Sequence, residues 1–187
     1  MSAPHPLAER LIERLQTRSQ SRVVDFAAGS GRNGAALRRA GLTVVTVDDA
    51  TAESEDPLAA LQAPVDAVVS THGLLHGTPA SIATRVRALA GALSQGGLLY
   101  ATFGSRRDAR FGQGERIDDS TFAPLEGDER GVAHAYFDRH GLEKLLSGSF
   151  AVESFEEVFV DEIAGSWAHR ERPLTGAVHW FAVAKKR

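Results

Sequence analysis

A glycine-rich turn behind a carboxylate is the feature of this sequence that points most directly to chemistry. Residues 25–34 read DFAAGSGRNG, which places Gly29, Gly31 and Gly34 shortly after Asp25. Glycines in such a turn allow a ligand to approach the backbone, and the free N–H groups of a following helix can hold an anionic group. The GxGxxG spacing alone leaves three interpretations open: a dinucleotide, S-adenosylmethionine (SAM), or a tight turn without a ligand.

Two acidic positions favour SAM among these ligands. Asp25 is expected at the end of a strand, pointing into the ligand crevice, where its charge would repel a pyrophosphate in a partly dry site. SAM has no phosphate and carries an ammonium and a sulfonium group, both cationic. Asp48, with Asp49 beside it, ends the next expected strand, where a carboxylate can accept hydrogen bonds from both ribose hydroxyls. A strand-terminal surface aspartate is the alternative for Asp48.

The elements that must position these residues alternate along the chain. Apolar periodicity, together with Gly and Pro punctuation, predicts helices over residues 6–18, 33–39, 79–93 and 138–146, and strands over residues 23–26, 42–47, 67–70, 98–103, 152–160 and 178–184. This alternation predicts an α/β fold with a parallel sheet, closed by a late antiparallel pair of strands. Residues 106–133 have no clear period and are expected to form a long excursion. A chain of 187 residues fits a single domain, residues 1–187.

The turn and the strand after it resemble motif I and the acidic position that follows it in class I SAM-dependent methyltransferases. The stretches DFAAGSGRNG and VVTVDD carry this resemblance, and residues 31–33, GRN, look like the tellurite-resistance and thiol methyltransferase-like branch. Residues 109–117, 131–137 and 179–186 are also similar to that branch. The resemblance implies a Rossmann-like sheet, mostly parallel, with a C-terminal antiparallel strand pair. It also implies SAM as the cofactor, bound by Asp25, Ala27, Gly29, Gly31, Arg32, Asn33, Asp48 and Asp49.

Two departures from the family pattern affect the expected pocket. Ala27 stands where the family usually has its first motif glycine, and because alanine is small the loop is expected to survive. Residues 48–64 are too few for the helix and strand that the family normally has there, so the third strand and helix region should be shortened. Asp56, in a DPL context, is the best candidate for the adenine amino group. A solvated acidic loop is the alternative.

The acceptor side should follow the third clear strand, beyond the carboxyl end of the sheet. In the resembled family this stretch, Ser70, Thr71 and His72, lines the methionine and sulfonium side. His72 would then touch SAM or the acceptor, although a histidine in such a loop is often a structural hydrogen-bonding group. His76 is a weaker candidate for the same role.

The excursion and the residues after it supply three further catalytic candidates. Arg110, beside Phe111, would suit a lid that grips a small anionic or soft acceptor. His134 and Tyr136 alternate in an AHAYF run, so they could share one face of a strand and deprotonate or orient an acceptor. A solvated loop for Arg110, and hydrogen-bonded core positions for His134 and Tyr136, are the alternatives. Trp167 and His169 carry no usable pattern.

Composition excludes several other classes of function. The net charge of −3 gives no reason to expect a nucleic-acid partner, and the absence of cysteine removes disulfides, thiolate metal sites and a cysteine nucleophile. No apolar run is long enough for a membrane span, which makes the cytoplasm the expected location. His72 and His76 are spaced i, i+4, but Gly73 and Gly77 argue against a helix there and no third ligand is evident, so no metal is expected. Neither a Walker A sequence nor a GxSxG nucleophile elbow is present.

Transfer of a methyl group from SAM to a small-molecule acceptor is the predicted function. The acceptor would attack the methyl group in line, and alignment and water exclusion would supply most of the catalysis. The resemblance favours a soft nucleophile such as a thiol or a reduced chalcogen oxyanion. A SAM-binding sensor or partner domain without transferase activity is the alternative, because the short connection at residues 48–64 would weaken an adenine pocket. The sequence does not predict an oligomeric state.

Overall fold

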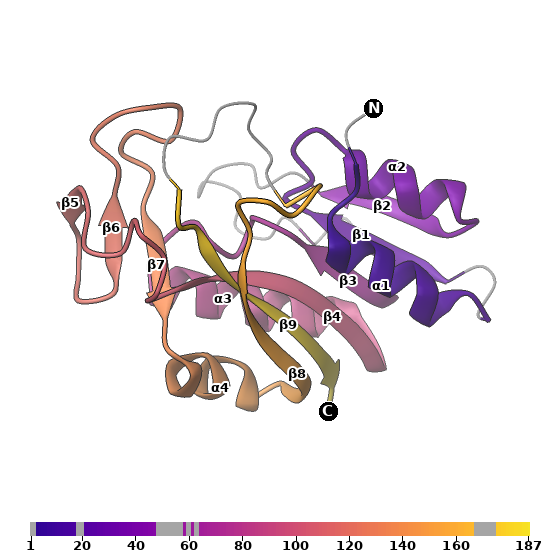
Figure 1. Ribbon diagram of the computed structural model, residues 1–187. Coiled ribbons are helices and arrows are strands. Elements are labelled where there is room, and N and C mark those ends of the chain that lie inside the picture. The colour runs from indigo at the N-terminus through magenta and orange to yellow at the C-terminus, as the bar shows by residue number, and fades with distance from the viewer. Residues whose placement is uncertain (1–2, 18–20, 48–57, 59–60, 62–63, 167–174) are drawn as a thin grey trace.

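The computed structural model describes residues 3–17, 21–47, 58, 61, 64–166 and 175–187 (Figure 1). Helices and strands alternate through the first half of the chain, and strands predominate in the second half. In chain order the elements are α1 (Pro6–Leu15), β1 (Arg22–Phe26), α2 (Arg32–Arg39), β2 (Thr43–Val47), β3 (Val65–Ser70), α3 (Pro79–Ala92), β4 (Leu93–Ser105), β5 (Glu115–Arg116), β6 (Thr121–Ala123), β7 (His134–Phe137), α4 (Arg139–Ser147), β8 (Phe150–Phe159) and β9 (Val178–Lys186).

The central sheet is parallel from β2 through β1 and β3 to β4. Val24 of β1 lies beside Val45 of β2 and Val68 of β3, so β1 is flanked on both sides. Beyond β4 the direction reverses, because β9 runs antiparallel to β4, with Tyr100 opposite Val183, and β8 runs antiparallel to β9. The predicted fold class is therefore confirmed: a mostly parallel sheet closed by a C-terminal antiparallel pair.

The excursion after β4 contains two short strands, β5 (Glu115–Arg116) and β6 (Thr121–Ala123), that the sequence did not indicate. β5, β6 and β7 form a short antiparallel extension, and β7 pairs in parallel with the last residues of β4. β5 and β6 have two and three residues, so each is too short to show a period in the sequence. The expected long excursion over residues 106–133 therefore includes two short strands.

Helices cover both faces of the sheet (Figure 1). Adjacent residues of β1, Val23 and Val24, enter opposite apolar layers, as the alternation of side chains along a strand requires. The layer of Val23 is completed by α1 and α2, through residues such as Leu11 and Leu37. The layer of Val24 is completed by α3 and α4, through residues such as Ile82. The sheet thus fixes the strand ends between two helical layers.

The edge of the sheet beside β2 is where the predicted shortening of the third strand and helix region, residues 48–64, would be seen. Among the residues that the structure describes, no strand lies beyond β2. Most of the connection from β2 to β3 lies outside those residues, so the shortened helix and strand remain a prediction.

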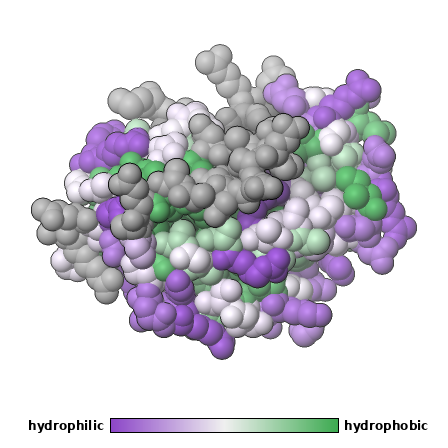
Figure 2. All heavy atoms as spheres, turned by 180° about the vertical axis from the view of Figure 1, so that it is seen from behind, coloured by the Kyte–Doolittle hydropathy of each residue, from purple (hydrophilic) through white to green (hydrophobic). Residues whose placement is uncertain are grey.

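On the face opposite to that of Figure 1, hydrophilic side chains surround smaller apolar areas (Figure 2). No helix within the described ranges is long and apolar enough to cross a membrane.

Candidate functional site

The glycine-rich turn leaves the carboxyl end of β1 and leads into α2. Gly29 and Gly31 have φ of +52° and +70°, in the left-handed region that glycine adopts without strain. No heavy atom lies within 4 Å of the position that a Cβ would take at either glycine, so the backbone here faces open space. Gly31 is the N-cap of α2, which brings the free N–H groups of the helix to the same place.

The Asp25 side chain lies inside the turn and holds its backbone in place. Its side chain is buried, and Oδ2 accepts a hydrogen bond of 2.7 Å from the backbone N–H of Gly34. Asp25 also acts electrostatically on Arg32, where it opposes the lowering of the guanidinium pKa by burial. The structure therefore gives Asp25 a role in positioning the turn, and its contact with a cationic ligand stays a prediction.

Asn33 and Thr71 are brought together from α2 and from the end of β3. The amide nitrogen Nδ2 of Asn33 donates to Oγ1 of Thr71 at 2.9 Å, and Oδ1 of Asn33 accepts from the backbone N–H of His5 at 2.9 Å. These bonds tie the N-terminal segment to the turn. Ser70 Oγ is buried beside them without a hydrogen-bond partner among the described residues.

Three predicted contacts of the nucleoside lie outside the described residues. They are Asp48, Asp49 and Asp56. The same holds for Trp167 and His169. The ribose and adenine side of the expected pocket therefore stays a prediction.

A row of three histidines lies on the other side of the turn. His72 lies between His5 and His179, with ring centroids 6.2 Å and 6.1 Å away. Burial is the main cause that lowers all three pKa values, to about 3 for His5, to about 4 for His179 and well below the ordinary value for His72. The row is therefore uncharged at neutral pH.

The hydrogen bonds of His5 fix the tautomer that this neutral ring adopts. Nδ1 accepts from the backbone N–H of Leu7 at 3.1 Å, which caps the start of α1. The proton of the neutral ring therefore sits on Nε2, which is buried and has no partner among the described residues. Nε2 of His72 is likewise buried without such a partner. Buried polar atoms of this kind normally find a partner, so this row suits a polar ligand.

Arg110 closes the row at the end next to His179. Its guanidinium binds the buried Asp108 carboxylate through Nε at 2.7 Å and Nη2 at 2.6 Å, and Nη2 lies 3.2 Å from Nε2 of His179. Asp108 also accepts from the backbone N–H of Val178 at 2.9 Å. Arg110 is thus held in place by an ion pair, rather than standing free on a lid. If Arg110 binds an acceptor as predicted, it must do so through the part of its guanidinium that the ion pair with Asp108 leaves exposed.

His134 and Tyr136 lie on β7 as predicted, but their side chains have different neighbours. The Tyr136 ring packs in an aromatic cluster with Phe111 and Phe122, at centroid distances of 5.6 Å and 6.4 Å, and burial raises its hydroxyl pKa. Nε2 of His134 lies 3.2 Å from a carboxylate oxygen of Glu129. Each side chain thus has its own partners, and a joint acid–base role for the two residues stays a prediction.

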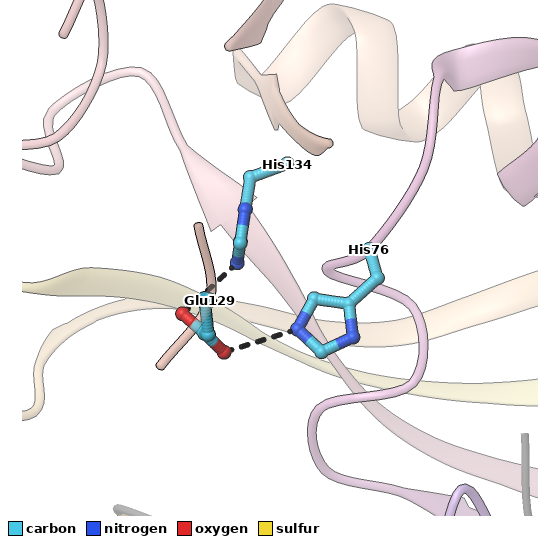
Figure 3. A group of neighbouring side chains, drawn as sticks. All are labelled: His76, Glu129 and His134. Carbon is cyan, nitrogen blue, oxygen red and sulfur yellow. Dashed lines mark hydrogen bonds and ion pairs between the residues drawn. The ribbon is translucent and has the colours of Figure 1, made fainter. Parts of the chain in front are cut away.

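His76 joins His134 at the same carboxylate. Its Nε2 lies 3.3 Å from Oε1 of Glu129, and the two imidazole rings stand nearly perpendicular with centroids 4.8 Å apart (Figure 3). His76 therefore meets a partner on β7 rather than His72, four residues earlier. The ligand atoms of these three residues lie within 4.8 Å of one another, a set that could hold a metal ion.

Sequence reasoning missed four residues at this site. His5 precedes Pro6 at the start of a helix, and a cap signal could have marked it, although not its approach to His72. Asp108 stands two residues before Arg110, close enough to suggest an ion pair. His179 lay within a stretch that resembled the family, whereas Glu129 carried no signal.

Comparison with solved structures finds this architecture in proteins of low sequence identity. No protein-family model matches the sequence, and no curated protein matches it significantly. The chain is similar to Burkholderia thailandensis 1,6-didemethyltoxoflavin-N1-methyltransferase, crystallised with 1,6-didemethyltoxoflavin and S-adenosylhomocysteine, with 17% identity, 97% of this chain and 79% of that chain covered, and a TM-score of 0.63. The fold is that of the SAM-dependent methyltransferases.

Two further methyltransferase structures have the same fold. A SAM-dependent methyltransferase from Methanosarcina mazei is 15% identical, with 98% of each chain covered and a TM-score of 0.64. Magnesium protoporphyrin IX methyltransferase from Synechocystis, crystallised with SAM, is 14% identical, with 96% of this chain and 78% of that chain covered and a TM-score of 0.59. None of the three is described as a tellurite-resistance protein, so that narrower resemblance stays a prediction.

Proposed function

We propose that this chain is a SAM-dependent methyltransferase that acts on a small acceptor. The observation that carries the proposal is the place of the glycine-rich turn. The connection after β1 leads to β2 on one side and the connection after β3 leads to β4 on the other, so the carboxyl ends of β1 and β3 flank the switch point where open α/β sheets bind ligands. Two solved structures of this fold hold SAM or S-adenosylhomocysteine, which supports the same cofactor here.

The residues of the turn suit SAM. Open space at Gly29 and Gly31 admits a ligand against the backbone, and the N-terminus of α2 offers N–H groups to a carboxylate. The Asp25 carboxylate beneath the turn favours a cationic ligand over a pyrophosphate. When bound, SAM supplies a methyl group on a sulfonium centre that is also the leaving group.

The histidine row suits the acceptor side. Its middle member, His72, lies two residues after the end of β3, and His179 lies at the start of β9, so the row borders the carboxyl end of the sheet. His5 offers a buried N–H donor to this space. The low pKa values of His72 and His179 make both rings weak bases at neutral pH. Their work is therefore to orient the acceptor and exclude water, with little proton transfer.

The chemical class of the acceptor rests on the sequence resemblance. That resemblance favours a soft nucleophile such as a thiol or a reduced chalcogen oxyanion, which needs little general-base assistance. A site of uncharged histidines is compatible with such an acceptor. A labelled-methyl screen over thiols, chalcogen anions, phenols and amines tests this class, and transfer only to amines or phenols would contradict it.

A matched pair of glycine variants tests the cofactor site. Gly31 and Gly41 both have positive φ, +70° and +85°, and both have open space where a Cβ would stand. Replacing either by alanine should cost roughly 1–2 kcal/mol of backbone strain. Only Gly31 lies at the carboxyl end of β1, because Gly41 follows the far end of α2. By calorimetry with SAM, Gly31→Ala should weaken binding at least tenfold, and Gly41→Ala should leave it unchanged.

Asp25→Asn tests the charge of the site separately from its shape. Asparagine keeps an oxygen that can accept from the Gly34 N–H, so the turn should survive while the negative charge is lost. Weaker binding of SAM with an unchanged thermal midpoint is expected. Wild-type protein that binds neither SAM nor S-adenosylhomocysteine below about millimolar would overturn the proposal. Binding without transfer to any acceptor would favour the non-catalytic SAM-binding domain instead.

A further inference from the structure

We propose that His76, Glu129 and His134 form a binding site for one divalent transition-metal ion of the Zn²⁺ type. The three side chains come from separate segments: the loop after β3, the loop after β6, and β7 (Figure 3). Their ligand atoms lie within 4.8 Å of one another. The site does not depend on the proposed methyltransferase function.

The hydrogen bond on the far side of the His134 ring sets its tautomer. Nδ1 of His134 lies 2.8 Å from the backbone carbonyl oxygen of Val132, which only accepts, so Nδ1 carries the proton. In the neutral ring, Nε2 then points a lone pair at the Glu129 carboxylate, 3.2 Å away. Nε2 is therefore the nitrogen of His134 that can bind a metal ion, and it lies beside a carboxylate oxygen. A backbone carbonyl behind the ring is also the usual outer partner of a metal-bound histidine.

The ligand atoms lie near the spacing of a tetrahedral site, within 4.8 Å of one another. Around zinc, with bonds of about 2.0–2.1 Å, neighbouring ligand atoms lie about 3.3–3.4 Å apart. Nε2 of His76 lies 3.3 Å from Oε1 of Glu129, and Nε2 of His134 lies 3.2 Å from Oε2, so each histidine faces a different oxygen and the carboxylate must turn for one ion to reach all three residues. Two imidazoles and a carboxylate suit zinc and its transition-metal neighbours better than Mg²⁺ or Ca²⁺, which prefer oxygen ligands.

The backbone holds the two histidines opposite each other before any ion arrives. His76 and His134 form an isolated antiparallel bridge. Hydrogen bonds on either side of them reinforce it, from Ala135 N–H to the Leu75 carbonyl at 3.1 Å and from Gly77 N–H to the Ala133 carbonyl at 2.6 Å. Such preorganisation lowers the entropic cost of ordering the ligands on binding.

One side of the group is open to solvent. The side chains of His76 and Glu129 are 32% and 26% exposed, whereas that of His134 is 8% exposed. An ion held here would have three protein ligands and an accessible fourth position, as in zinc sites that keep a water molecule.

Titration of the metal-free chain with Zn²⁺ tests the site. The chain is purified without a polyhistidine tag, treated with chelator and titrated by calorimetry. We expect one Zn²⁺ per chain with a dissociation constant in the micromolar range or tighter, and Co²⁺ in its place should give the intense visible absorption of a low-coordinate site. Mg²⁺ should not bind detectably. Absence of Zn²⁺ and Co²⁺ binding, or Mg²⁺ binding of equal strength, would overturn the assignment.

Substitutions locate the ion. His76→Gln and Glu129→Gln should each weaken Zn²⁺ binding by at least about 100-fold, the upper end of the loss seen when only an outer partner is removed. His76 is half-exposed, so its replacement should leave the fold intact even where that of the buried His134 does not. His140→Gln, on the exposed side of α4, is the matched control and should bind as the wild type does. Binding that survives both His76→Gln and Glu129→Gln would place the ion elsewhere and sink the proposal.

Discussion

Ala27 is the residue at which this turn departs most clearly from an unstrained backbone. It is the one non-glycine residue with positive φ, +55°, in the described part of the chain. A Cβ in the left-handed region lies close to the following carbonyl oxygen, which costs roughly 1–2 kcal/mol. The methyl group also faces Gly73, where an added Cβ would overlap it. A side chain at position 73 is therefore excluded as long as position 27 carries a methyl group.

Ala27→Gly should stabilise the protein. Relief of the positive φ outweighs the greater freedom that glycine has in the unfolded chain, so the gain should reach up to about 1 kcal/mol. Urea denaturation at neutral pH measures the free energy of unfolding. An equal or lower stability would show that the turn carries no strain at Ala27.

Gly73→Ala should destabilise the protein, and by less when Ala27 is already glycine. Overpacking of this kind costs about 1–3 kcal/mol. In the double variant the overlap with the Ala27 methyl is gone, and the remaining neighbours, Ser70 Oγ at 3.1 Å and Phe26 Cδ1 at 3.2 Å, require only small shifts. A double-mutant cycle measures this coupling, and additive effects would contradict the contact.

At the scale of single elements, α4 shows how a short helix is positioned beside the site. It begins after Asp138, whose Oδ1 accepts from the Gly141 N–H at 2.7 Å. Its apolar face enters the core through Leu142 and Leu146. Because β7 leads directly into this cap, the start of α4 fixes where β7 ends, and with it the position of Tyr136.

Asp138→Ala should destabilise the protein by about 1 kcal/mol, because the start of α4 loses a capping acceptor. Asp138→Asn keeps an acceptor, so its free energy of unfolding should fall by only a few tenths of 1 kcal/mol. Asp138 also lies 3.4 Å from Arg106, but both side chains are about half exposed, so this ion pair contributes little. Thermal melts of the two variants and of Arg106→Gln separate the cap from the ion pair. A larger loss for Arg106→Gln than for Asp138→Ala would contradict this assignment.

At the scale of the whole molecule, the buried histidines make stability depend on pH. His5 and His179 are 0% and 1% exposed, and their pKa values fall from 6.5 to about 3 and about 4. Well above pH 6.5 neither the folded nor the unfolded state binds a proton at these rings. Below it the unfolded state gains protons that the folded state excludes, so stability falls as the pH falls toward the folded pKa values.

His5→Asn should flatten this dependence. Each excluded proton costs about 1.4 kcal/mol per pH unit, so His5 contributes a loss on the order of 2 kcal/mol between pH 6.5 and pH 5. Asparagine can cap α1 in place of the imidazole but does not titrate. Urea midpoints at pH 7, 6 and 5 give the slope, and the exposed His140→Gln variant should keep the wild-type slope. Parallel slopes for wild type and His5→Asn would refute a buried neutral His5.

The sequence by itself determined the features that depend on neighbours along the chain. Apolar periodicity marked the helices and the long strands, because burial of one face imposes that period locally. The turn at Gly29 and Gly31 was recognisable because positive φ restricts the residue type at those positions. The closing pair β8 and β9 followed from two apolar runs after a parallel core.

The tertiary structure alone decided which polar groups meet. His5 meets His72 and Phe181, and His72 meets His179, because α1 packs on the face of the sheet that carries Val69 of β3 and Phe181 of β9. Glu129 meets His76 and His134 because β7 pairs with β4 and brings its start beside the loop after β3. Such contacts depend on strand order and on turns within an excursion that has no period. No spacing along the chain encodes them, and only the folded sheet brings these side chains together.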